Sequence, residues 1–212
     1  MRTEELVEHL AAEARPVGSD RRPRMLGMAL MAGAIVSIGV LVAWLGLRPM
    51  DEAVVQSAFW MKAGYSLALA LGGGLIVWRL AMPTGRVGRA PYLVAAAMVV
   101  VAVLAMMQLM RAPAGSMETI VLGHTWKWCA FRILTLSLPL TLALCLALRR
   151  LAPTRLTLAG AAVGVLAGGL AAAIYGLYCQ ETSAVFLALW YSLGVALSGL
   201  LGALIGPRLM RW

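Results

Sequence analysis

Two cysteines lie in sequence contexts that favour sulfur chemistry. Cys129 falls in the stretch GHTWKWCAFR, residues 123–132, and Cys179 falls in YGLYCQET. Cys129 is expected in the first turn of a helix, where unsatisfied N–H groups and the positive end of the helix dipole favour an anion such as a thiolate. Arg132, three residues further on, shares that helix face, and a nearby cation promotes thiol reactivity. The pattern predicts a redox-sensing or metal-sensing pair.

The residues around the cysteines leave several fates open for the pair. A disulfide requires Cα atoms within about 7 Å and an oxidising compartment. A soft metal ion bound transiently by both sulfur atoms is the alternative, with Met117, His124 or Glu181 completing its shell. No resident cofactor is expected.

A structural interpretation stands beside each of these functional ones. A membrane cysteine is commonly a small apolar filler, which is how we interpret Cys145. His124 falls in a loop, where a histidine needs no ligand role. Arg132 and Trp128 are four residues apart and suit a cation–π pair that anchors the helix.

Six apolar segments dominate the chain and must position these residues. Each is long enough, at about 1.5 Å per helical residue, to cross a hydrocarbon core of about 30 Å. The sequence therefore predicts an all-α membrane protein, with residues 1–24 as a tail and residues 25–212 as a transmembrane domain. The predicted spans are residues 25–47, 58–78, 92–110, 128–148, 156–178 and 184–206.

The arginines and lysines fall mostly on one side of these spans. Thirteen of the 18 lie before the first span, between the second and third, between the fourth and fifth, or after the sixth, and five lie near the other ends. Cations near span ends mark the cytoplasmic side. We therefore expect three in-out-in hairpins with both termini cytoplasmic and lipid as a partner. The net charge of +9 then reflects topology, and no direct nucleic-acid binding is expected.

Small residues recur every four positions in the last two spans. Such ridges let helix backbones approach closely in a membrane, so we expect the fifth and sixth spans to pack tightly. The residues are Gly160, Gly164 and Gly168 in one span and Gly194, Ser198, Gly202 and Gly206 in the other.

The amino-terminal stretch TEELVEHLAAEA, residues 3–14, has the pattern of a short amphipathic helix. Leu6, Val7 and Leu10 share one face, and Glu4 belongs to the acidic face. An acidic helix with an apolar stripe suits a groove on a basic protein, which makes these four residues the candidate partner contacts. A solvated, frayed tail is the alternative, because so short a helix is marginal alone.

Three segments carry a resemblance to a known family: MRTEELVEHLAAEARPV with the following RRPR, the APTR that enters the fifth span, and YCQETSAVFLALWYSLGVALSGLLGALIGPRLMRW at the end. Over its full length the chain resembles the NrsF family of membrane anti-sigma factors, negative regulators of sigma-F-type extracytoplasmic function sigma factors. The resemblance implies a bacterial inner-membrane protein whose tail holds a sigma factor inactive until a heavy-metal or oxidative signal arrives. It also implies that Cys129, in WKWCAFR, and Cys179, in YCQE, are the two outer cysteines important for that response.

Two other functional classes use the same features. A small metal-handling transporter needs polar groups along a buried pathway, and the spans offer little beyond Lys62, Gln108 and Arg132. A membrane thiol oxidoreductase would use the cysteines catalytically, but the sequence has no C-x-x-C motif and no visible quinone or flavin site. We therefore expect a regulator that is not an enzyme.

Overall fold

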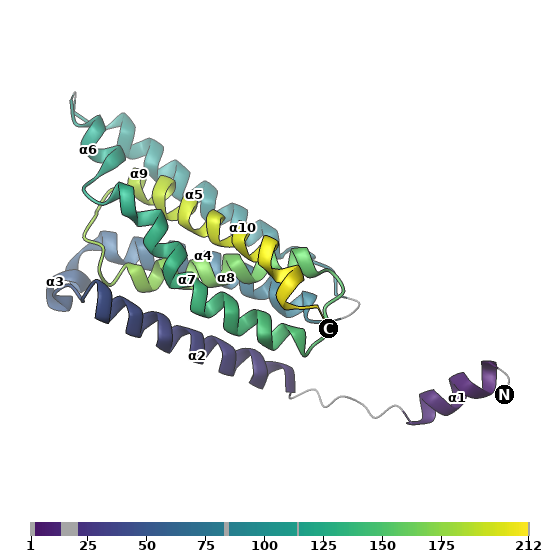
Figure 1. The fold of residues 1–212 in the computed structure, drawn as a ribbon. Helices are drawn as coiled ribbons and strands as arrows, with labels where there is room; N and C mark the ends of the chain where they lie inside the picture. The colour runs from purple at the N-terminus through teal and green to yellow at the C-terminus, as the bar shows by residue number, and fades with distance from the viewer. Residues whose placement is uncertain (1–2, 14–20, 83–84, 114, 212) are drawn as a thin grey trace.

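A computed structural model describes residues 3–13, 21–82, 85–113 and 115–211 of the chain. The described residues from 21 onward form an elongated helical bundle, and the helix at 3–13 lies apart from it (Figure 1). The long helices run along the bundle, and the short helices α3 and α6 lie at the end opposite the C-terminus and the start of α2. The helices are α1 (Thr3–Glu13), α2 (Arg21–Trp44), α3 (Met50–Val55), α4 (Ser57–Leu80), α5 (Ala90–Met110), α6 (Met117–Leu122), α7 (Trp126–Arg149), α8 (Leu156–Tyr175), α9 (Ala184–Phe186), the π-helix η1 (Leu187–Tyr191) and α10 (Ser192–Leu209).

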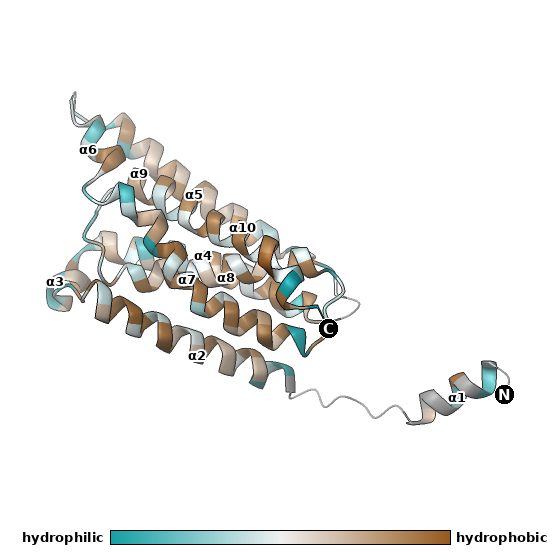
Figure 2. Cartoon of the chain, in the orientation of Figure 1, coloured by the Kyte–Doolittle hydropathy of each residue, from teal (hydrophilic) through white to brown (hydrophobic). Residues whose placement is uncertain are grey.

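The prediction of six apolar spans is confirmed for the part of the chain that the structure describes. Six helical segments, the last formed by α9, η1 and α10 together, are long and apolar enough to cross a membrane. Apolar residues cover the length of these helices, while hydrophilic residues gather toward the two ends of the bundle (Figure 2).

The helices begin and end at slightly different residues from the predicted spans, because hydropathy marks the membrane portion of a helix and local geometry sets its ends. The helix of the first span, α2, starts at Arg21 and ends at Trp44, just before Gly46 turns the chain with φ +79°. The helix of the fifth span, α8, ends at Tyr175, three residues earlier than predicted, so Cys179 lies in a loop.

The first two hairpins share one layout. In each, a long helix is followed by a link, a six-residue helix (α3 or α6) and then a 24-residue helix (α4 or α7). The short helices begin at Met50 and Met117, so similar segments build the same end of the bundle twice.

Helix α8 is the centre of the packing. The most apolar 18-residue stretch of α8 is 67% buried, whereas that of α5, at the periphery, is 11% buried. Helix α8 packs against α4, α7 and α10. The predicted close approach of the last two spans is confirmed. A β-carbon at Gly160 or Gly164 would overlap the backbone carbonyl oxygen of Gly202 or Ser198 on α10.

The amino-terminal segment is helical, as predicted, over α1. The side chains of Glu4 and Val7 are exposed on it. The side chains of Leu6 and Leu10 lie outside the described part of the structure.

Candidate cysteine site

The structure brings Cys129 and Cys179 into one buried cluster. Cys129 lies in the first turn of α7, and Cys179 lies in the loop after α8, where its N–H donates to the carbonyl oxygen of Tyr175 at 3.0 Å. Both side chains are 0% exposed, belong to the same apolar core and lie within electrostatic reach of each other. All three cysteines of the chain are free thiols, and Cys145 lies in a separate cluster.

The surroundings of Cys129 differ from the open helix start that the sequence suggested. The N–H of Cys129 already donates to the carbonyl oxygen of Thr125 at 3.0 Å, and its sulfur is enclosed by core residues. Thiol reactivity requires access as well as a favourable field. In this structure Cys129 is therefore shielded from water-borne reagents.

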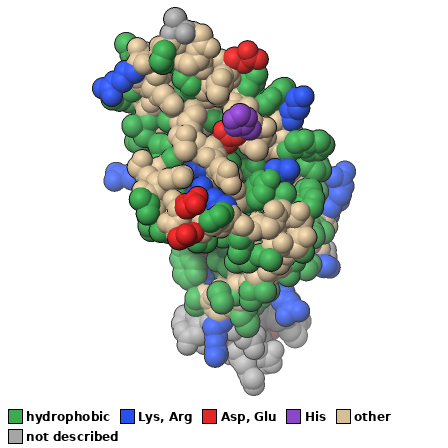
Figure 3. Space-filling view, turned by 90° about the vertical axis from the view of Figure 1, so that its left-hand side faces the viewer, with side chains coloured by type: hydrophobic (Ala, Val, Ile, Leu, Met, Phe, Trp, Pro, Cys, Tyr) green, Lys and Arg blue, Asp and Glu red, His purple; other side chains and the backbone are tan. Residues whose placement is uncertain are grey.

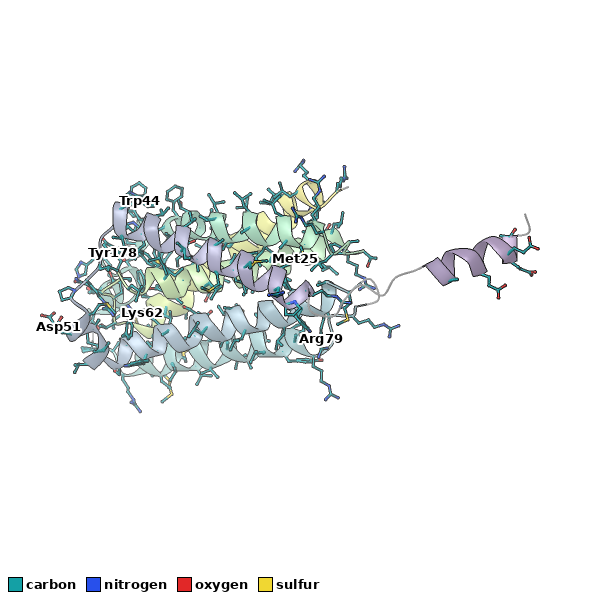
Figure 4. The ribbon with its side chains drawn as sticks, turned by 90° about the horizontal axis from the view of Figure 1, so that it is seen from below. Met25, Trp44, Asp51, Lys62, Arg79 and Tyr178 are labelled. Atoms are coloured by element: carbon teal, nitrogen blue, oxygen red, sulfur yellow. The ribbon has the colours of Figure 1, made fainter. Side chains whose placement is uncertain are left out.

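A lysine lies beside both thiols. Lys62, on α4, is only 3% exposed, and its Nζ donates to the carbonyl oxygen of Cys179 at 2.7 Å. Its charge interacts with both Cys179 and Cys129. Figure 4 places Lys62 at the same end of the bundle as Tyr178 and Asp51, opposite Met25 and Arg79.

In the sequence, Lys62 was considered only as one of the few polar groups within the spans. The signal that would have found it is its isolation, since it is the one charged residue of residues 58–78. An ionisable side chain within a span is a functional-site hypothesis by default.

A second cation is buried nearby. Arg48 is 8% exposed, its guanidinium carbon lies 5.2 Å from the centroid of the Phe59 ring, and its backbone N–H donates to the carbonyl oxygen of Leu177 at 3.3 Å. The Nε and Nη2 atoms of Arg48 are buried without a hydrogen-bond partner. Two cations therefore flank the loop that carries Cys179.

Glu181 fastens that loop to the start of α7. Its Oε1 accepts hydrogen bonds from the N–H groups of His124 (2.7 Å) and Thr125 (3.1 Å) and from the Thr125 hydroxyl (3.3 Å). A carboxylate there satisfies the N–H groups of the two residues that precede α7 and lies near the positive end of the helix dipole. Gly123, with φ +56°, makes room, because a β-carbon would lie 2.6 Å from Oε2.

The predicted auxiliary residues thus have a structural arrangement of their own. Glu181 acts as a clamp, and His124 contributes its backbone N–H while its side chain is exposed. Within the described residues no group of three or more His, Cys, Asp and Glu side chains is placed to hold a metal ion. His124 and Glu181 therefore do not complete a metal shell with the two cysteines in this arrangement.

The expected pairing of Arg132 with Trp128 is wrong. The guanidinium carbon of Arg132 lies 5.2 Å from the centroid of the Tyr178 ring, and Trp128 instead packs edge-on against Phe131 at 6.3 Å. The loop after α8 passes close to α7 and offers Arg132 a second aromatic ring, which spacing within one helix does not reveal.

Further hydrogen bonds build the same end of the bundle. Oε1 of Gln108 accepts from the N–H of Ala184 at 2.7 Å, the Ser183 hydroxyl donates to the carbonyl oxygen of Ile120 at 2.9 Å, and Nε1 of Trp190 donates to that of Val121 at 2.9 Å. Of these residues, Gln108, Ile120 and Ser183 line a cavity of about 610 Å³. The end face is a mosaic of charged, histidine and apolar groups (Figure 3).

Comparisons with known proteins agree on one family. The family described as "Negative regulator of sigma F", NrsF, matches residues 10–212. The anti-sigma-F factor NrsF of Caulobacter vibrioides (strain NA1000 / CB15N) is 40% identical over 215 residues, and the probable anti-sigma-F factor NrsF of Azospira oryzae (strain ATCC BAA-33 / DSM 13638 / PS) is 33% identical over 213 residues. Each alignment covers 100% of both chains. No solved structure matches the chain.

Proposed function

Because the chain belongs to the NrsF family of negative regulators of sigma F, we propose that it holds an extracytoplasmic function sigma factor inactive at the bacterial inner membrane. The family is regulatory rather than catalytic, so the partner is a sigma factor and the output is its release.

The proposed topology has both termini in the cytoplasm and the cysteine site on the outer side. The uneven distribution of arginine and lysine supports this orientation. The bundle is consistent with it, since Met25 and Arg79 lie at one end and Lys62 and Tyr178 at the other (Figure 4).

Residues 1–24 are the proposed sigma-factor-binding segment. The helical α1, with Glu4 on its acidic side and Leu6, Val7 and Leu10 along one face, has the pattern of a helix that docks into a groove on a partner. Residues 25–212 then serve as anchor and sensor.

The sensing step is proposed to occur at Cys129 and Cys179. The observation that carries this proposal is that α7 and the loop after α8 place both thiols in one closed core. A well-packed interior does not deform continuously, so a new sulfur–sulfur or sulfur–metal bond must shift α7 against α8. Since α8 also packs against α4 and α10, such a shift reaches the cytoplasmic end of the bundle.

Retention of the sigma factor by membranes that contain the full chain tests this function. We expect Leu6→Asp with Leu10→Asp to release the sigma factor into the soluble fraction, because two carboxylates would enter the apolar face. Ala12→Asp adds charge on the opposite, exposed side of α1 and should retain it. Equal retention by the double variant and by Ala12→Asp would exclude this face as the binding surface.

A further inference from the structure

Several buried polar groups around the two thiols lack a counter-ion or a hydrogen-bond partner. In the described part of the chain, the hydrogen bond from Lys62 Nζ goes to a neutral carbonyl, and two nitrogen atoms of Arg48 make no hydrogen bond. The hydroxyl groups of Tyr175 and Tyr191 are also buried without a hydrogen-bond partner. Burying a cation or a hydrogen-bond donor unpaired costs free energy, so each such group in a native structure calls for an explanation.

These groups converge on the sulfur atoms. Tyr175 lies against Cys129, Tyr191 lies against Cys179, and the Lys62 ammonium interacts with both thiols. A neutral thiol is a weak acceptor, whereas an anionic sulfur accepts hydrogen bonds and attracts cations. Lys62 and the neighbouring hydroxyl groups therefore favour a thiolate, whereas burial and the negative charge of Glu181 oppose it while the site is closed.

We propose that Lys62 is the counter-ion of the cysteine pair and that the Tyr175 and Tyr191 hydroxyls complete an anion-stabilising cage for the thiolate. Lys62 is thus a positioning residue that sets how readily the pair reacts. This inference rests on the proposed sensing function and assigns the residues that tune it. The other charged groups near Lys62 act in opposite directions, since Arg48 adds positive charge and Glu181 adds negative charge.

The chemical step is deprotonation followed by bond formation. When the site opens, a thiol proton passes to water and the sulfur keeps the electron pair, stabilised by the Lys62 ammonium. The thiolate then binds a soft metal ion or displaces a leaving group from an electrophile. Because Lys62 is pinned by the carbonyl of Cys179, its charge is in place before the proton leaves.

Site-resolved alkylation of the full-length protein in lipid nanodiscs tests the proposal. Iodoacetamide forms one sulfur–carbon bond and releases iodide, and mass spectrometry follows Cys129 and Cys179 separately. We expect Lys62→Met to slow alkylation of both by about ten-fold or more, and Lys62→Arg to stay within about three-fold of wild type, because a nearby charge acts strongly in a low-dielectric site. Tyr191→Phe, which removes only a hydroxyl, should slow Cys179. Lys127→Met, an exposed position two residues before Cys129, is the matched control and should have no effect.

The direction of the change separates electrostatics from packing. Loss of a mere clamp would open the site and speed alkylation, so a Lys62→Met rate equal to or above wild type overturns the proposal. Equal slowing by Lys62→Arg and Lys62→Met also overturns it, since the charge would then be irrelevant. Sigma-factor release is scored independently. If Lys62→Met slows alkylation but the wild-type protein never releases its sigma factor, the counter-ion role stands and the sensing function is refuted.

Discussion

Glu181 joins the loop that carries Cys179 to the helix that carries Cys129, so replacing it should open the cysteine site. Its Oε1 accepts three hydrogen bonds of 2.7, 3.1 and 3.3 Å. A hydrogen bond to a charged group contributes about 1.5–3 kcal/mol, and an anion at a helix N-terminus about 0.3–1 kcal/mol. Because one partly exposed oxygen makes all three bonds, we assign the clamp a total of about 2 kcal/mol, equivalent to about a 30-fold change in the opening equilibrium.

Iodoacetamide alkylation in nanodiscs measures this opening. Glu181→Ala should accelerate alkylation of Cys129 and Cys179 by about 30-fold, whereas Glu181→Gln, which keeps an acceptor oxygen, should accelerate it by less than about five-fold. A wild-type rate in Glu181→Ala would refute the clamp. Equal acceleration by both substitutions would assign the effect to charge instead of to the hydrogen bonds.

Three further predictions concern helix packing, topology and the hydrogen-bond network beside the cysteine site. Gly164→Ala should destabilise the protein by about 1–3 kcal/mol in thermal unfolding, because the added β-carbon would meet the backbone of α10. Gly64→Ala, which has open space at its β-carbon, should be neutral or slightly stabilising. Equal effects of the two substitutions would contradict the tight α8–α10 contact. The native cysteines are buried and should not react with an impermeant maleimide. The reagent should therefore label Glu118→Cys in intact cells and Arg86→Cys only after permeabilisation. The reverse order of labelling would invert the proposed topology. Gln108→Leu leaves the N–H of Ala184 without its acceptor and should lower stability by about 1–3 kcal/mol, measured by the same thermal unfolding; an unchanged midpoint would show that the bond at 2.7 Å is dispensable.

The sequence was sufficient to predict the features that depend on composition and local period. Six apolar runs dictate six helices because unpaired backbone groups are too costly in lipid. The ridge formed by Gly160 and Gly164 predicts the close contact with α10, since small residues on one face leave no alternative filler. Cys129 and Cys179 were predicted to act as a pair from their sequence contexts, and both thiols lie in one cluster.

The features that depend on partners distant in sequence could not be predicted. The hydrogen bond from Lys62 to Cys179 joins residues 117 positions apart, and the clamp formed by Glu181 joins it to residues more than 50 positions away. Arg132 was given a partner on its own helix because only local spacing was visible, and the loop residue Tyr178 takes that place. Burial of Cys129 likewise follows from how α7, α8 and α10 meet, which no local pattern records.

Cadmium-induced release of the sigma factor from membranes tests the proposed role of the cysteine pair. Vesicles that contain the full chain and its bound sigma factor are treated with cadmium, a soft thiol-binding ion, and the soluble fraction is assayed. We expect release from wild type and from Cys145→Ala, but retention by Cys129→Ala and by Cys179→Ala. Release from the Cys129→Ala and Cys179→Ala membranes at the wild-type cadmium concentration would contradict it.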